Sequence, residues 1–271
     1  MIGTTLGDSP QPLSILYYGS PGTAKTTSAL GLARLGKVLL IDAEGGANAK
    51  ALTSQNVPIS QIDSWPASPR ELSFEAIMGV AKQLQSSNEY TAVVVDSLTE
   101  IARRLLDVQV AKTSRTGESG TQPTMQDYGV VASQLRVVFR RFRDSGLHVA
   151  FTALQRRTED ENTGAASYGP ALSASVANDV LGLVDIVLYT DVIEIGGQVF
   201  RVGGSVPLKL RTAKDRTGAL PPRLVSPSGD RVLGYVNGEL ARESDPVQLA
   251  ALAAASKVAE AIAETTDQQT E

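Results

Sequence analysis

A short glycine-containing stretch, Gly19–Thr27 (GSPGTAKTT), has the residue types and spacing of a phosphate-binding loop. The usual pattern is G-x-x-x-x-G-K-[ST], and Gly19, Lys25 and Thr26 match it in register. In such a loop, backbone N–H groups and a helix N-terminus surround the phosphates, the lysine reaches the terminal ones, and the hydroxyl binds Mg²⁺. We expect the whole stretch to bind nucleotide: Gly19, Ser20, Pro21, Gly22, Thr23, Ala24, Lys25, Thr26 and Thr27, with Thr26 also on the metal.

Ala24 stands where the pattern has glycine. Alanine is accommodated wherever φ is negative, and the residue before the lysine opens the following helix. We therefore expect Ala24 to adopt a helical backbone and its methyl group to lie close to the phosphates.

Carboxylates follow two further apolar runs. Asp96 comes directly after TAVVV, and Asp42 and Glu44 follow KVLLI. An acidic residue at a strand end beside the loop can hold Mg²⁺, and a second carboxylate can accept a proton from the attacking water. We expect Asp96 on the metal side and Glu44 as the catalytic base.

The elements that must position these residues alternate between strand and helix. Apolar runs predict four buried strands: Leu13–Tyr18, Lys37–Ile41, Thr91–Val95 and Leu147–Thr152. Helices are predicted at Thr26–Leu35, from Ser68-Pro69 onward, around Leu98–Leu105 and Val131–Phe142, and from Ser244–Pro246 to the C-terminal region. Nearly continuous apolar strands alternating with helices are typical of an α/β fold with a mostly parallel sheet covered on both faces.

After Gly182 the pattern changes to antiparallel strands. Two strand-like runs surround Gly196-Gly197, which indicates a hairpin, and LKLRTA (208–213) predicts one more strand. Two polar stretches, Lys112–Gln126 and Arg156–Pro170, predict long loops, which are often functional in compact domains.

Composition excludes several classes of protein. The 271 residues include no cysteine, so disulfides and Cys-based zinc sites are excluded, and a reducing cytoplasm is expected. No run of eighteen apolar residues predicts a membrane span, and no secretion signal is recognised. The acidic residues concentrate in 239–271, which has a net charge of −5 and leaves +1 for 1–238. We expect one domain over 1–238 and an acidic helix and tail over 239–271.

Together the loop, LLIDAEGG and VVVDSLTEI resemble the RecA-type recombinase ATPases, and most of all the compact phage RecA-like proteins grouped with the Sak-type single-strand annealing proteins. The segment LKLRTAKDRTG strengthens this resemblance, which covers about Ser14–Arg223. It implies a RecA-like core that hydrolyses ATP with Mg²⁺, with Lys214 and Arg216 reaching into the neighbouring subunit's nucleotide. Thr152 and Gln155 are alternatives for the residue that senses the γ-phosphate, and Gln155 is also a candidate nucleotide ligand.

The resemblance also implies single-stranded DNA as a partner. Its DNA-contacting loops correspond to Lys112–Gln126 and Arg156–Pro170, where Arg115, Arg156 and Arg157 would meet phosphates and Tyr168 would stack on a base. The implied protein is a homo-oligomer, in a filament or a ring, that anneals or exchanges DNA strands in the cytoplasm of a host, with a single-strand-binding protein as a further partner.

Two other functions remain open from the residues alone. A partition-type ATPase of the ParA class has a similar strand before its acidic residue, but that class carries an early lysine where this loop has Ser20 and Pro21. The other alternative is a nucleotide-gated assembly protein without activity on DNA strands.

Overall fold

The computed structural model describes residues 12–66, 68–113, 122–160, 164–208 and 210–267. Its strands are β1 (Ser14–Gly19), β2 (Val38–Asp42), β3 (Ile62–Trp65), β4 (Ala92–Asp96), β5 (His148–Glu159), β6 (Ala166–Pro170), β7 (Ile186–Ile195), β8 (Gln198–Gly204), β9 (Lys214–Asp215) and β10 (Arg223–Val225). The main sheet runs in the order β10-β8-β7-β1-β5-β4-β2-β3, with β6 beside β5 and β9 beside β7.

Six neighbouring strands, from β7 through β1, β5, β4 and β2 to β3, are parallel. At one end β8 and β10 are antiparallel, and β7 and β8 form the predicted hairpin. The carboxyl ends of parallel strands meet at one edge of a sheet, so the segments that follow β1, β2 and β4 come together. The predicted α/β class is confirmed.

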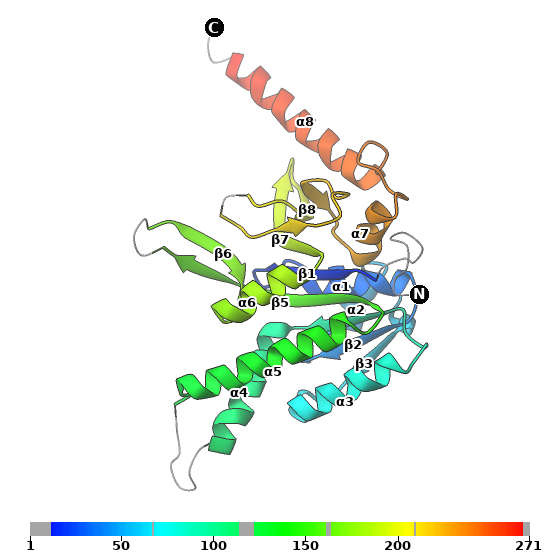
Figure 1. Cartoon of the computed structure of the whole chain (residues 1–271). Coiled ribbons are helices and arrows are strands. Elements are labelled where there is room, and N and C mark those ends of the chain that lie inside the picture. The colour runs from blue at the N-terminus through cyan, green and yellow to red at the C-terminus, as the bar shows by residue number, and fades with distance from the viewer. Residues whose placement is uncertain (1–11, 67, 114–121, 161–163, 209, 268–271) are drawn as a thin grey trace, which may run out of the picture.

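Helices cover both faces of the sheet (Figure 1). They are α1 (Lys25–Leu30), α2 (Ala49–Thr53), α3 (Phe74–Gln85), α4 (Leu98–Thr113), α5 (Met125–Arg143), α6 (Ala174–Leu183), α7 (Gly229–Val236) and α8 (Pro246–Asp267), with short 3₁₀ turns at Gly31–Arg34, Ile59–Gln61 and Pro69–Glu71. Successive residues of a strand face opposite sides, so Leu16 packs with α3–α6 while Tyr17 packs with α1 and α7.

Two helices differ from their predicted bounds. The helix expected from Ser68-Pro69 begins only at Phe74, because Ser73 is the residue whose side chain caps it, accepting a hydrogen bond from the Ala76 N–H at 3.1 Å. The helix expected over Thr26–Leu35 is α-helical only to Leu30 and continues as a 3₁₀ turn.

The stretch predicted as a second long loop is mostly a β-hairpin, so that prediction was wrong. β5 continues past the sheet to Glu159 and pairs antiparallel with β6, in the register Arg156 with Gly169 and Arg157 with Tyr168. The strand predicted over LKLRTA is also wrong for the residues described there: Arg211 makes only isolated bridges, and Leu210 has φ = 64°, which interrupts an extended chain.

The C-terminal helix α8 begins at the predicted place. Asp245 is fully buried just before it and accepts hydrogen bonds from the Tyr235 hydroxyl (2.6 Å) and from Arg231. Gln248 in its first turn bonds to the backbone of β10, and beyond this contact α8 extends away from the sheet (Figure 1). None of the helices in the described part of the chain combines the length and hydrophobicity needed to cross a membrane.

Candidate nucleotide-binding site

The predicted phosphate loop connects the carboxyl end of β1 to α1. A Cβ atom on Gly19 would lie 2.4 Å from the carbonyl oxygen of Thr190, so only glycine fits at the start of the loop, and Gly22 has φ = 79°. The Lys25 ammonium group lies across the loop and donates hydrogen bonds to the carbonyl oxygens of Gly19 (3.2 Å) and Ser20 (2.7 Å). This arrangement places a cation and a helix N-terminus where an anion would bind.

The backbone of Ala24 differs from the prediction. It is left-handed, with φ = 64° and ψ = 31°, rather than helical. For residues with a Cβ atom this conformation costs about 1–2 kcal/mol, which explains why the usual pattern has glycine here. Ala24 therefore keeps the loop geometry of a glycine at a cost in strain.

Replacing Ala24 by glycine should relieve this strain. We expect Ala24→Gly to change the free energy of unfolding by less than about 1 kcal/mol, because the relief is offset by the greater freedom of glycine in the unfolded chain. Ala29→Gly, in the right-handed helix of α1, should cost about 1 kcal/mol or more. Denaturant unfolding of both variants checks the comparison, and an equally large loss for Ala24→Gly would contradict it.

Asp96 lies at the end of β4, beside the loop. Its carboxylate accepts hydrogen bonds from the hydroxyl of Thr26 (Oγ1–Oδ2, 2.6 Å) and from the hydroxyl of Thr152, which lies just past the part of β5 that pairs with β4. Asp96 and Thr152 are both buried. The pair predicted to hold Mg²⁺, Thr26 and Asp96, is thus brought together from positions 70 residues apart.

Burial shapes the ionisation of this site. Removal from water raises the pKa of Asp96, the hydroxyls of Thr152 and Thr26 lower it in part, and the charges of Glu44 and Asp42 raise it further. Burial likewise lowers the pKa of Lys25, while the nearby Asp96 and Glu44 carboxylates raise it. Both groups would gain from a ligand that supplies opposite charge: a cation for Asp96 and phosphate for Lys25.

Glu44 and Asp42 have different environments after β2. The exposed Glu44 accepts a hydrogen bond from the hydroxyl of Ser97 (2.6 Å). Ser97 directly follows Asp96, and the peptide bond between these two residues is cis. Asp42 instead accepts from the N–H groups of Gly45 (2.7 Å) and Gly46 (3.3 Å), which stabilises the turn. Of the two, Glu44 is the carboxylate that is free to meet a water molecule.

Gln155 approaches the loop from β5. Its Nε2 donates to the hydroxyl of Ser20 (2.6 Å), while its Oε1 is buried and has no hydrogen-bond partner among the described residues. Thr152, the alternative sensor, is instead bound to Asp96 and has no exposed surface. These contacts favour Gln155 as the residue beside the terminal phosphate, and Thr152 as a support for Asp96.

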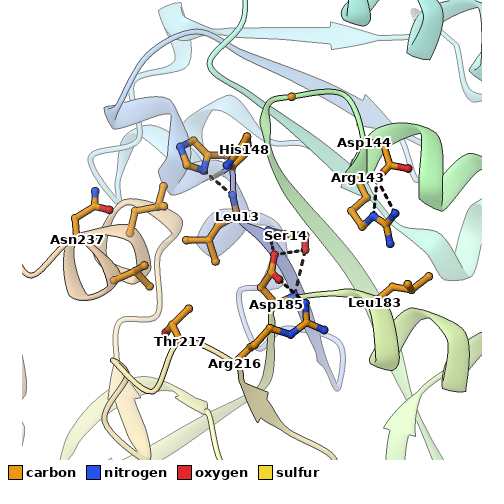
Figure 2. A pocket seen from close by; sticks show the side chains of 14 residues that line it. Leu13, Ser14, Arg143, Asp144, His148, Leu183, Asp185, Arg216, Thr217 and Asn237 are labelled. Atoms are coloured by element: carbon orange, nitrogen blue, oxygen red, sulfur yellow. Dashed lines mark hydrogen bonds and ion pairs between the residues drawn. The ribbon is translucent and has the colours of Figure 1, made fainter. Parts of the chain in front are cut away.

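Lys214 and Arg216 lie at the opposite edge of the sheet. Lys214 pairs with Val187 near the start of β7, whereas the loop follows the end of β1. Its ammonium group donates to the carbonyl oxygens of Leu181, Gly182 (both 3.0 Å) and Val184 (2.7 Å) at the end of α6. Arg216 pairs with Asp185 (2.9 Å) at a pocket of about 850 Å³ that Figure 2 shows. Neither residue reaches the phosphate loop of its own chain.

The residues predicted to contact DNA divide between two faces of the hairpin. Arg156 is one residue from Arg157 on β5, so their side chains point to opposite faces. Arg157 pairs with Glu159 (3.1 Å), and the guanidinium of Arg211 lies 5.9 Å from the ring centre of Tyr168. Arg115 lies outside the described residues, as does much of the first predicted loop.

Two residues of the site were not predicted. Ser97 orients Glu44, and its place directly after Asp96 was the only signal in the sequence. Thr190 on β7 bonds to Thr23 of the loop (2.8 Å) and to the carbonyl oxygen of Tyr18 (3.1 Å). No local pattern marks Thr190, because its contacts depend on the pairing of β1 with β7.

The sequence and the fold were compared with known protein families, curated proteins and solved structures. A solved structure described as the crystal structure of the RadB recombinase is 20% identical to this chain, with a TM-score of 0.47 over 72% of this chain and 80% of that one. No curated protein matched the sequence. The family described as "AAA domain" matches residues 11–217, which include every element of the parallel sheet and the loop. The protein belongs to this family of AAA domains, and it is an ATPase.

Proposed function

We propose that this ATPase is a DNA recombination protein, which binds single-stranded DNA, oligomerises on it and promotes annealing or strand exchange. The observation that carries the ATPase part is the contact of Thr26 with Asp96 beside Lys25. The DNA part rests on the resemblance to the RecA-type recombinases and on the arginine-bearing hairpin beside this site.

The residues present fit a magnesium nucleotide. Thr26 and Asp96 supply a hydroxyl and a carboxylate oxygen, the hard donors that Mg²⁺ prefers. Bound there, Mg²⁺ would neutralise charge on the β- and γ-phosphates. Next to Thr27 a cavity of about 470 Å³ extends from the loop toward Asn56 and Arg201, and the Ser228 hydroxyl that lines it is buried without a partner. We place the nucleoside in this cavity.

The residues around the phosphate loop then have distinct roles. Lys25 binds the terminal phosphates, and Gln155 senses the γ-phosphate through its amide group. Glu44, held by Ser97, orients the attacking water and accepts its proton. The hairpin and the segment between α4 and α5 contact DNA, with Arg115, Arg156 and Arg157 on phosphates and Tyr168 on a base.

Lys214 and Arg216 complete the site of the neighbouring copy. Their position at the opposite sheet edge supports this proposal, because a head-to-tail assembly joins different surfaces of identical copies. Such an assembly forms either a ring or an open filament.

Lys214→Ala should reduce ATP turnover while nucleotide binding by the isolated chain is retained. It also removes three hydrogen bonds to the end of α6, so its folding is checked by thermal unfolding. An equal mixture with Lys25→Ala should recover about a quarter of the parental turnover, because about a quarter of head-to-tail interfaces would combine an intact loop with an intact Lys214. Normal turnover by Lys214→Ala under assembly conditions would contradict the proposed role.

The function is tested by ATP hydrolysis with and without single-stranded DNA, with duplex DNA and Lys25→Ala as controls. Strong stimulation by single strands supports a recombinase. Turnover by the parental protein that is the same with and without single-stranded DNA would favour a ParA-type partition ATPase or a nucleotide-gated assembly protein. A single-strand-binding protein can be added to the same assay to test that partner.

A further inference from the structure

A third cavity, of about 380 Å³, opens between α4, α5 and α6 at the base of the β5–β6 hairpin. Its walls are largely apolar, with Leu106, Val131, Leu135 and Val176 among them. No residue of the phosphate loop lines it, so it is separate from the nucleotide site. Its size falls in the range of pockets that hold one small ligand or part of a larger one.

The mouth of this cavity carries an aromatic ring and two cations. Tyr128 on α5 is 49% exposed, and a ring in this position can stack on a planar ligand. Arg103 on α4 has its side chain 62% exposed, with Glu100 no nearer than 3.6 Å. Arg156 enters from the hairpin, and among the residues that the structure describes it forms no ion pair.

The charges at the mouth define the chemistry of the occupant. Among the residues that the structure describes, those two arginines are the only charged side chains that line the cavity, and no Asp or Glu does. A purely apolar occupant would leave the Arg156 guanidinium without an anion and Arg103 with only its contact to Glu100 at 3.6 Å. A planar ring with phosphates on either side satisfies the walls, Tyr128 and the arginines together.

We propose that this cavity holds one unstacked base of single-stranded DNA, stacked on Tyr128, with Arg103 and Arg156 on the flanking phosphates. This inference rests on the proposed DNA-binding function and adds a base pocket to it. Thr99 and Ser173 are the only uncharged polar residues besides Tyr128 along the cavity, too few to read a base, so the pocket accepts any sequence.

The test compares two fluorescently labelled strands, one intact and one with a central run of abasic sites, at one salt concentration with ATP and Mg²⁺. The protein should bind the intact strand about tenfold more tightly, the size of one base-stacking contact. Tyr128→Ala should lower this preference by weakening only the intact strand, leaving the share that Tyr168 contributes, whereas Tyr128→Trp should keep it. The new tryptophan should also be quenched by the intact strand and not by the abasic one.

Arg157, the neighbour of Arg156 in the sequence, provides a control variant. Arg157 faces the other side of the hairpin, so Arg157→Ala should weaken both strands by the same factor and leave the preference intact. Filling the cavity by Ala132→Phe should lower the preference as Tyr128→Ala does. Thermal unfolding of each variant checks that it folds before its binding is compared.

The outcomes separate this inference from the proposed function. If the protein binds neither strand, DNA binding fails and the base pocket fails with it. If it binds both strands equally, or if Tyr128→Ala keeps the whole preference, DNA binding stands and the base pocket is wrong. A Tyr128→Ala change that alters only self-association without DNA would show that a second copy covers the cavity, which also overturns the proposal.

Discussion

Lys25→Ala is expected to lower ATP turnover at least about 100-fold, the size of effect seen when one preorganised phosphate- or oxyanion-stabilising group is lost. The side chain lies across the loop on the carbonyl oxygens of Gly19 and Ser20. Burial disfavours its charged form and lowers its pKa, so the ammonium group gains from a bound anion. Nucleotide binding should weaken as well, because the same charge meets the terminal phosphates.

Lys50→Ala is the matched control for this variant. Lys50 is exposed on α2, which follows Glu44 in the chain, and its replacement removes the same charge outside the loop. Its turnover should equal that of the parent. Steady-state hydrolysis and a fluorescent-nucleotide titration measure both variants, and a Lys25→Ala protein that turns over ATP at more than a tenth of the parental rate would exclude the loop as the active phosphate site.

Asp96→Asn is expected to lower turnover by a similar factor while the free energy of unfolding changes by less than about 1 kcal/mol. The carboxylate is buried, and its raised pKa shows that its charge is held at a cost. Removing that charge offsets the loss of one hydroxyl–carboxylate hydrogen bond from Thr26 or Thr152. Function is lost because the metal loses its anionic ligand.

Asp127→Asn provides the opposite case. Asp127 is also buried, but hydrogen bonds from the Thr124 backbone and hydroxyl lower its pKa, so its charge stabilises the start of α5. A group with a lowered pKa contributes stability above the pKa of the unfolded state and loses it as the pH falls. Asp127→Asn should therefore reduce the free energy of unfolding at neutral pH and keep basal turnover. Chemical denaturation of Asp127→Asn and Asp96→Asn measures both stabilities. A larger loss of stability for Asp96→Asn would contradict this assignment.

The chemistry of the candidate nucleotide-binding site could be predicted from the sequence because it depends on short local patterns. The loop residues are consecutive, Asp96 directly follows an apolar run, and Glu44 lies three residues after another. Apolar runs that alternate with helices imply parallel strands, and parallel strands bring their carboxyl ends to one edge. The pattern therefore predicts that the loop, Asp96 and Glu44 lie close together in space, and the contact of Thr26 with Asp96 agrees with this prediction.

The hairpin of β5 and β6 was missed because it leaves the sheet. Its residues from Arg156 onward are polar and largely exposed, so they lack the apolar alternation that marks a half-buried strand. The backbone of Ala24 was missed for a different reason: alanine has no local signal for a left-handed conformation, which the surrounding loop and α1 impose.

The sequence by itself determined the class of fold and predicted the loop with its candidate metal and catalytic residues, since consecutive residue types and hydrophobic period carry both. Only the tertiary structure decided which distant side chains meet. It paired Thr152 with Asp96 and Gln155 with Ser20, and it placed Lys214 at the far edge of the sheet. Strand order and register set those contacts, and both depend on packing between segments that are distant in the sequence.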